Sequence, residues 1–337
     1  MKVLVIGTGS IGKRHMANLL SLGHEVHAFS ERLAQGVAHQ LPEGVDAVPS
    51  LAGLVHAGFD AAVVANRTDQ HLASATAALE FCNALYIEKP LAANLAGLAN
   101  LQAVCTQRKT TVELGFMMRY HPNLQWIKTH LQSGQCGEVM HVRASVGQWL
   151  PDWRPGTDHR EGFGAFYRYG GGVTMELIHE IDLVNWLLGE TMDVCAMQRP
   201  LQHLEIETEA ISEISMRLGS GILAQVHLDY VRPGYGRTLE ILCSKGVLTW
   251  DYSSSRVVVT GANGQQTIVD EASGFERNVM FMDAMRYFLR RVKEPSLAPA
   301  ASLDEGVQSL RVALASHQSS RERRFVRPSD VAEEFIL

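Results

Sequence analysis

The first twelve residues constrain the fold more than any other stretch of the chain. Residues 2–6, KVLVI, are a continuous apolar run rich in β-branched residues, which is typical of a strand buried on both faces. Gly7, Gly9 and Gly12 follow in GxGxxG spacing, and a segment with helical spacing of apolar residues then ends at Gly23. The stretch EVHAFS is predicted to form a second strand. This order of strand, glycine turn, helix and strand predicts a dinucleotide-binding fold.

The glycine turn predicts where a cofactor would bind. Glycines permit a tight turn and let the backbone N–H groups at the helix start approach a pyrophosphate, so Ser10 and Ile11 are expected beside the cofactor as well. An acidic residue after the second strand favours NAD, whereas an arginine there accommodates the phosphate of NADP. Ser30, Glu31 and Arg32 occupy this place. Glu31 favours NAD, whereas Arg32 favours NADP. The choice between NAD and NADP is therefore unresolved by the sequence.

The alternation of strands and helices continues to about residue 116. Strands are predicted in 60–66, 84–92 and 110–116, with helices in 71–81 and 95–108. Ligands of open α/β sheets bind beyond the carboxyl ends of the strands. Further cofactor-binding candidates are therefore the polar residues that follow two of these strands: Asn66, Thr68, His71, Glu88 and Lys89.

Lys89 is also a catalytic candidate. Pro90 restricts its backbone to extended conformations and so fixes the origin of its side chain. A lysine in a partly desolvated place has a lowered pKa and can transfer protons. The alternative is a solvated lysine in front of a proline turn.

Composition excludes several classes of protein. The 337 residues suggest about two domains, and the net charge of −6 without a basic tract argues against nucleic acid as a partner. No apolar run approaches the roughly 18 residues of a membrane span, and the apolar N-terminus is better interpreted as a strand than as a signal peptide. The five cysteines are scattered without CxxC spacing, so no disulfide framework or zinc site is expected. A reducing, cytoplasmic compartment is the expected location.

The stretch GGGVTMELIHEIDLVNWLLG, residues 170–189, places three polar groups at intervals of three: Glu176, His179 and Asp182. On one continuous helix they would form a polar strip separate from the apolar face. In a catalytic interpretation His179 exchanges a proton with a substrate hydroxyl, Glu176 orients it or touches the substrate, and Asp182 fixes its tautomer. A metal site and a hydrogen-bonded structural histidine are the alternatives. No metal is expected, because no further histidine cluster accompanies the triplet.

The second half of the chain changes pattern, from alternating strands and helices to successive hairpins followed by two amphipathic helices. The change predicts a dinucleotide-binding domain in 1–120 and a substrate domain in 121–337. Arginine suits phosphate and carboxylate binding, so an acidic sugar or a diphospho-sugar is the expected substrate. The substrate-binding candidates are Arg119, Tyr120, Trp153, Arg154, Arg160, Arg168 and His179.

Five motifs occur in one order along the chain: GTGSIGKRH, NRTDQH, EKPLA, GFMMRYHP and GGG…HEID…WLLG. Together they resemble the glucose-fructose oxidoreductase/inositol dehydrogenase/rhizopine catabolism (Gfo/Idh/MocA) family. The segment 146–161 is similar to the branch associated with sugar-nucleotide and polysaccharide genes. The resemblance implies an α/β fold, with an N-terminal Rossmann domain and a C-terminal α+β domain built on a large open, mostly antiparallel sheet. It also implies a homodimer or homotetramer.

The resemblance further implies NAD(P)-dependent oxidation or reduction of a sugar hydroxyl or ketone. Lys89 and His179 would flank the reacting carbon as acid/base groups, and an acid one turn before the histidine would complete the set. Counted from the glycines this acid is Glu176, which is the preferred assignment; counted back four residues from the histidine, the position is Met175.

The resulting prediction is a sugar or sugar-nucleotide dehydrogenase. Two alternatives stay open. One is a relative that cleaves a glycosidic bond through transient oxidation by a tightly held NAD. The other is a non-catalytic sensor or assembly protein that retains the NAD(P) site.

Overall fold

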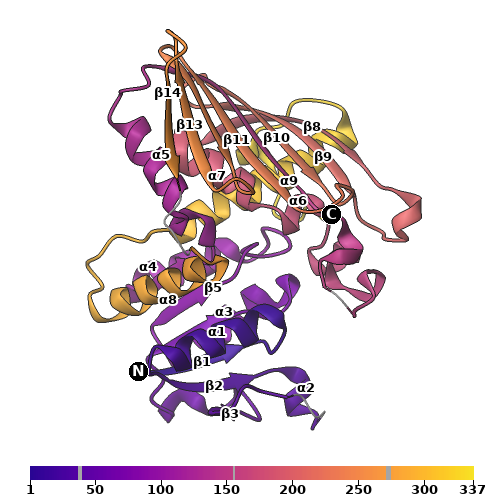
Figure 1. The fold of residues 1–337 in the computed structure, drawn as a ribbon. Helices are drawn as coiled ribbons and strands as arrows, with labels where there is room; N and C mark the ends of the chain where they lie inside the picture. The colour runs from indigo at the N-terminus through magenta and orange to yellow at the C-terminus, as the bar shows by residue number, and fades with distance from the viewer. Residues whose placement is uncertain (37–39, 155, 271–274) are drawn as a thin grey trace. The chain divides into compact units, whose positions relative to one another are not determined.

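The computed structural model describes residues 1–36, 40–154, 156–270 and 275–337. The chain forms two compact units, the first made of Met1–Met117 and Glu276–Val307 and the second of Met118–Phe275 and Gln308–Leu337 (Figure 1). The predicted boundary near residue 120 is close to the end of the first segment. Residues 276–307, however, belong to the first unit and not to the second domain to which the sequence pattern assigned them.

The first unit contains a six-stranded parallel sheet with the order β3-β2-β1-β4-β5-β6. Its strands are β1 Lys2–Ile6, β2 Glu25–Phe29, β3 Val45–Ala47, β4 Ala61–Val64, β5 Ala84–Ile87 and β6 Thr111–Leu114. Its helices include α1 Ser10–Ser21, α2 Glu31–Ala34, α3 His71–Ala78, α4 Leu98–Arg108 and α8 Arg277–Lys293. The central strands β1, β4 and β5 are buried along almost their whole length, as expected of a parallel sheet covered on both faces. The predicted Rossmann architecture is confirmed.

A buried ion pair explains why residues 276–307 return to the first unit. Glu113 on β6 is fully buried, and its carboxylate accepts hydrogen bonds from Arg291 of α8 at 2.9 Å and from the backbone N–H of Ala301 at 2.6 Å. Arg291 also donates to the carbonyl oxygens of Val112 and Leu297. These contacts fix α8 and the segment after it to the last strand of the sheet.

The second unit contains an eight-stranded sheet with the order β14-β13-β12-β11-β7-β10-β9-β8. Its strands are β7 Val139–Gly147, β8 Thr191–Arg199, β9 Ile211–Leu218, β10 Leu223–Asp229, β11 Gly236–Cys243, β12 Gly246–Asp251, β13 Arg256–Gly261 and β14 Gln266–Asp270. All neighbouring pairs are antiparallel except β7 with β10, which is parallel. The large, mostly antiparallel sheet predicted for this half is confirmed.

Helices cover one face of this sheet (Figure 1). They are α5 Pro122–Gln132, α6 Val173–Glu176, α7 His179–Leu188 and α9 Leu303–Glu322. Helix α7 contacts β7 and β10, and α6 contacts β9 and β10. On β9 the buried residues Ser212, Ile214 and Met216 alternate with exposed Glu213 and Ser215, so the opposite face of this strand is accessible within the unit.

The polar triplet of residues 170–189 does not lie on one helix. Helix α6 ends at Glu176, Leu177 leaves helical geometry with φ −101° and ψ 24°, and α7 begins at His179. Glu176 and His179 therefore belong to two helices separated by a break at Leu177 and Ile178, and not to the single continuous helix expected from the sequence. No helix in the described parts of the chain is long and apolar enough to cross a membrane.

Candidate active site

The glycine turn after β1 has the geometry that close approach of a ligand requires. Gly7 has φ +119°, and a Cβ there would lie 2.4 Å from the backbone of Ala65 and Asn66. A Cβ at Gly12 would lie 2.0 Å from the carbonyl oxygen of Gly7, whereas a Cβ at Gly9 would have no atom within 4 Å. The packing of the turn therefore requires glycine at positions 7 and 12, whereas Gly9 borders open space.

Helix α1 begins at Ser10, followed by Ile11, and its N-cap Gly9 supplies no capping side chain. The N-cap position of this twelve-residue helix thus makes no side-chain hydrogen bond to the first amides. Such a helix start attracts a pyrophosphate through its N–H groups and its dipole. The residues present fit a dinucleotide.

The residues after β2 take different roles. Ser30 accepts a hydrogen bond from Thr8 at 3.1 Å and caps α2 by accepting from the N–H of Leu33 at 3.3 Å. Glu31 accepts from Gln70 at 3.4 Å, and Arg32 is exposed. The Glu31 carboxylate thus lies beside the turn that follows β4.

His71 joins the turns that follow β4 and β5. Its Nδ1 lies 2.8 Å from the carbonyl oxygen of Pro90 and its Nε2 lies 3.1 Å from that of Asn66. The imidazole is buried, and burial lowers its pKa. Asn66 donates to Ser74 at 2.8 Å, and Thr68 is buried in the same turn. Both ring nitrogens of His71, expected beside the cofactor, thus face main-chain carbonyl oxygens of these turns, and the neutral imidazole donates its single N–H to one of them.

Glu88, another expected cofactor ligand, is buried and paired inside the first unit. Its Oε1 lies 2.8 Å from Nε2 of His15 on α1, and its Oε2 accepts from the N–H of Lys89 at 3.2 Å. His15 lies within the motif GTGSIGKRH but has no spacing that marks it as a partner of Glu88. Lys89 itself is half-buried.

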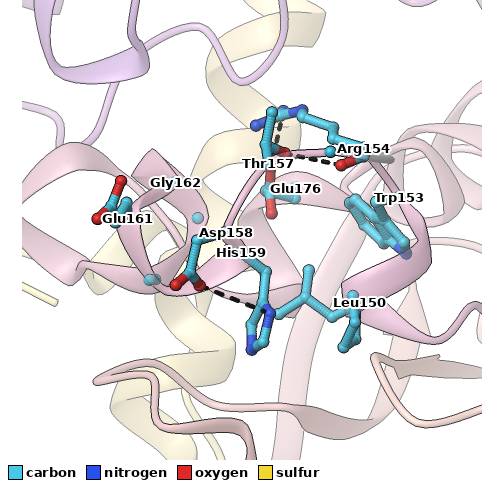
Figure 2. Close-up of a pocket in the computed structure, with 13 residues that line it drawn as sticks. Leu150, Trp153, Arg154, Thr157, Asp158, His159, Glu161, Gly162 and Glu176 are labelled. Carbon is cyan, nitrogen blue, oxygen red and sulfur yellow. Dashed lines mark hydrogen bonds and ion pairs between the residues drawn. The ribbon is translucent and has the colours of Figure 1, made fainter.

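The second unit contains a cavity of about 450 Å³, a usual size for a small-molecule site (Figure 2). Three predicted site residues line it: Trp153, Arg154 and Glu176. The remaining lining residues are Leu150, Pro151, Gly156, Thr157, Asp158, His159, Glu161, Gly162, Gly164 and Ala165. Most of the wall therefore comes from the loop between β7 and α6.

Glu176 is held in this wall by two polar contacts and lies in the space beside Gly164. Its Oε2 accepts from the hydroxyl of Tyr230 at 2.7 Å, and its Oε1 lies 3.9 Å from Nη2 of Arg154. A Cβ at Gly164 would lie 2.2 Å from Oε2, so the carboxylate occupies space that only glycine leaves. Burial and the neighbouring Glu176 carboxylate raise the pKa of Tyr230 well above its usual value, which keeps the phenol a donor.

The other polar residues of the triplet are also buried. His179 is 5% exposed at the start of α7, and it does not belong to the set that lines the cavity. Both oxygens of Asp182 accept from Arg119, at 3.0 and 2.6 Å, and both oxygens of Glu180 accept from Arg237, at 2.6 and 3.1 Å. Arg119, expected to bind substrate, is instead a buried partner of Asp182.

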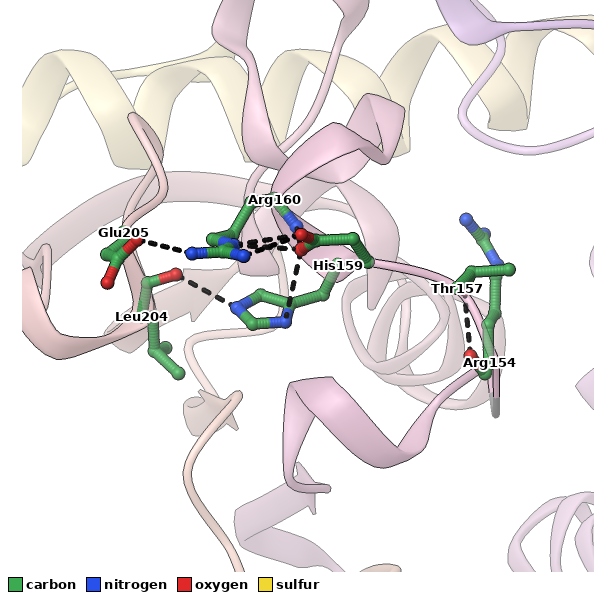
Figure 3. A network of polar contacts seen from close by, with 7 residues as sticks. Arg154, Thr157, His159, Arg160, Leu204 and Glu205 are labelled. Atoms are coloured by element: carbon green, nitrogen blue, oxygen red, sulfur yellow. Dashed lines mark hydrogen bonds and ion pairs between the residues drawn. The ribbon is translucent and has the colours of Figure 1, made fainter.

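The arginines expected to bind a phosphate or carboxylate are mostly engaged elsewhere. Arg160 binds Glu205 at 2.6 Å (Figure 3). It also binds Asp158 at 2.7 Å and lowers the pKa of that carboxyl to about 2. Arg168 lies over the rings of Phe166 and Tyr169 and 3.9 Å from Glu207. Among the described lining residues Arg154 is the single arginine.

Two of the remaining candidates have structural partners. Tyr120 is buried, and the ring of Trp153 packs edge-on against Tyr230 at 5.1 Å. His159, which lines the cavity, places its Nε2 2.9 Å from the carbonyl oxygen of Leu204 (Figure 3). Trp153 is thus a wall of the cavity that also supports Tyr230, the donor to Glu176.

Two family models match the chain. Residues 1–116 match the model described as oxidoreductase family, NAD-binding Rossmann fold, and residues 124–249 match the GFO/IDH/MocA C-terminal domain. The protein is thus an oxidoreductase with an NAD-binding Rossmann domain. It belongs to the Gfo/Idh/MocA family, as the motifs predicted.

Individual relatives agree with this assignment. The inositol 2-dehydrogenase/D-chiro-inositol 3-dehydrogenase of Lacticaseibacillus casei is 27% identical over 342 residues, which cover 97% of this chain and 94% of the relative. The protein of the same name from Shouchella clausii (strain KSM-K16) is 30% identical over 292 residues, 82% of this chain and 80% of the relative. A levoglucosan dehydrogenase in complex with NADH shares the fold with a TM-score of 0.85 at 18% identity, covering 98% of this chain and 100% of that one.

Proposed function

We propose that the protein is an NAD-dependent dehydrogenase that oxidises a CH–OH group of a sugar-like polyol. The observation that carries this proposal is the position of Glu176, a carboxylate in the wall of a cavity of about 450 Å³, held by Tyr230 and Arg154. A carboxylate in such a place can orient a hydroxyl-rich substrate or a catalytic imidazole. Relatives named as inositol dehydrogenases along nearly the whole chain support the same substrate chemistry.

The first unit would bind NAD. The amides at the start of α1 hold the pyrophosphate, and Glu31 is the acid available for the ribose hydroxyls. NAD supplies the acceptor for the hydride of the substrate carbon. Gly7 and Gly12 allow the tight packing of the turn, and Gly9 leaves open space at the start of α1 for this group to approach.

Lys89 and His179 are the groups to which we assign the hydroxyl proton. Lys89 is half-buried in front of Pro90, and His179 is buried at the start of α7. Lysine and histidine side chains both serve as general acid/base groups for hydroxyl substrates. Glu176 would orient the imidazole or bind a hydroxyl of the substrate.

The charges of the cavity favour an uncharged polyol over the sugar nucleotide considered from sequence. A diphosphate is usually bound by several arginines or amides together. Arg119, Arg160 and Arg168 are each near a carboxylate of the protein, which leaves Arg154 at the cavity. We therefore propose inositol-like or monosaccharide substrates.

The test is reduction of NAD by the purified protein with a panel of cyclitols, monosaccharides and UDP-sugars. We expect reduction with a neutral polyol, and a loss of about 10²- to 10⁴-fold in the Lys89→Met variant, which removes the proton-transfer group. The control is Lys109→Met, an exposed position. Absence of reduction with every substrate, or full activity of Lys89→Met, would refute the proposal.

A further inference from the structure

The residues just before β9 are bonded to the loops that surround Glu176. The N–H of Glu207 donates to the carbonyl oxygen of Ala165 at 3.0 Å, and the hydroxyl of Thr208 donates to that of Gly164 at 2.9 Å. Gly164 and Ala165 both line the cavity. The segment therefore holds one wall of the cavity through hydrogen bonds to two of the wall's main-chain carbonyl oxygens.

Glu209, the next residue, holds the helix that carries Glu176. Its carbonyl oxygen accepts from the N–H of Val173 at 3.2 Å, and its Oε1 accepts from the N–H of Thr174 at 2.9 Å. These are the first two amides of α6, a helix of four residues that ends at Glu176. A single helical turn has little stability of its own, so its position depends on such external contacts.

The carboxylate of Glu209 is enclosed by neighbouring residues. The residue is 0% exposed, and a Cβ at Gly172, which has φ +103°, would lie 2.4 Å from Oε2. Nε2 of His317 on α9 lies 3.7 Å from Oε1, and burial lowers the pKa of that imidazole. Burial and the Glu209 carboxyl raise the pKa of Tyr167, which also faces it. A rigid enclosure of this kind fixes the carboxylate, and with it the start of α6.

We propose that Glu209 is a positioning residue that fixes the direction in which Glu176 points into the cavity. The inference rests on the proposed function, in which Glu176 acts on the substrate. Removing the Glu209 side chain leaves the amide of Thr174 without its acceptor and lets α6 shift. The change should act on turnover and leave cofactor binding as it is, because Glu209 lies in the second unit and NAD is proposed to bind the first.

The test compares Glu209→Ala with Glu209→Gln, which retains an oxygen acceptor of the same length. Loss of one buried hydrogen bond should lower kcat about tenfold in Glu209→Ala, with the KM for NAD unchanged. Glu209→Gln should restore most of the loss. Amide hydrogen exchange of residues 173–178 should be faster in Glu209→Ala than in the wild type. The matched control is Glu213→Gln, an exposed position on β9.

A wild-type kcat and wild-type amide hydrogen exchange in Glu209→Ala would overturn the proposal. An equal loss of kcat in Glu209→Gln would also overturn it, since the oxygen that accepts from Thr174 would then not be what matters. If Glu209→Ala does not fold, Glu209→Asp replaces it, because its carboxylate is one methylene too short to reach Thr174. If none of the substrates supports reduction of NAD by the wild type, the proposed function fails. The exchange rates still decide whether Glu209 fixes α6.

Discussion

Met175 and Glu176 are adjacent in the chain but have opposite environments. Met175 is fully buried in the core of the second unit, whereas Glu176 lines the cavity and accepts from Tyr230. Successive residues of a helix point in directions about 100° apart, which explains the difference. Of the two positions considered for the family's acid, we therefore propose Glu176.

Glu176→Gln tests this assignment. The amide oxygen can still accept from Tyr230, so the variant removes the charge and leaves the packing in place. We expect kcat/KM for the polyol to fall roughly 10²-fold, because a neutral amide orients an imidazole or a hydroxyl less strongly. Steady-state kinetics measure the change, and Met175→Leu is the control with near wild-type values expected. The reverse ranking of the two variants would assign the acid's place to residue 175.

The ion pairs of His227 on β10 make the stability of the fold depend on pH. Hydrogen bonding to Asp229, and then contact with Glu213, raises its pKa to about 9, against an ordinary value of 6.5. The ion pairs therefore stabilise the fold fully below pH 6.5, and this contribution is lost as the pH rises through about 9. Its side chain is 37% exposed, so solvent screening limits the effect to about 1 kcal/mol.

Urea unfolding of the wild type and His227→Gln at several pH values measures this contribution. The difference in free energy of unfolding should be about 1 kcal/mol near pH 6 and close to zero near pH 10. A difference that does not change between these conditions would show that His227 keeps its ordinary pKa in the folded protein.

Residue-level prediction from sequence succeeded where a local pattern has a single steric reason. Gly7, Gly9 and Gly12 were recognised from spacing, because the turn leaves no room for side chains or needs an open approach. Tyr230 was missed, since it meets Glu176 from 54 positions away in the chain. The burial of Arg119 was missed for the same reason, because its partner Asp182 lies 63 positions away.

Among the elements, the segment from α8 to the start of α9 depends on one strand of the first unit. Glu113 and Arg291 form an ion pair whose side chains are 0% and 7% exposed. Breaking a buried pair is costly, because it leaves one charge without compensation in the interior. The pair therefore links a late segment of the chain to the parallel sheet.

Arg291→Met should destabilise the first unit by about 3 to 5 kcal/mol. Arg290→Met, which disrupts an exposed pair with Glu294, should change stability by less than about 1 kcal/mol. Chemical denaturation of the two variants, followed by circular dichroism, provides the comparison. Equal stability of the two variants would mean that the Glu113 pair does not anchor the segment.

Helices and strands were predicted correctly where the sequence pattern is clear, and not where an element is very short or depends on tertiary contacts. The strand 2–6 was predicted with its observed bounds because four consecutive apolar residues, all buried, follow Lys2. The three-residue strand β3 has one half-buried and two exposed residues and so lacks such a pattern. The break between α6 and α7 falls at Leu177 and Ile178, where no glycine or proline marks it, so a continuous helix was expected.

At the scale of the whole molecule, the uncovered face of the eight-stranded sheet bears on assembly. Two exposed apolar side chains, Met197 at 74% and Leu223 at 56%, alternate with inward-facing core residues on β8 and β10. Exposed apolar side chains on an open sheet favour pairing with another surface. We propose, with the family resemblance, that this face forms the interface of a homodimer or homotetramer.

Light scattering coupled to size exclusion tests the assembly. We expect a mass of two or four chains for the wild type, and a shift toward the monomer for a Met197→Glu, Leu223→Glu double variant, because charges in an apolar interface are costly to bury. The double variant Glu333→Gln, Glu334→Gln, at exposed positions near the C-terminus, should keep the wild-type mass. A monomeric wild type would refute the oligomer.

The most direct test of the central claim is a calorimetric titration of the protein with NADH and, separately, with NADPH, after denaturation of a sample shows that no cofactor copurified. The account predicts saturable binding of NADH to one site per chain and its loss in Gly12→Val, since even a Cβ at that position would lie 2.0 Å from Gly7. Absence of NADH binding to folded, cofactor-free protein would contradict the account.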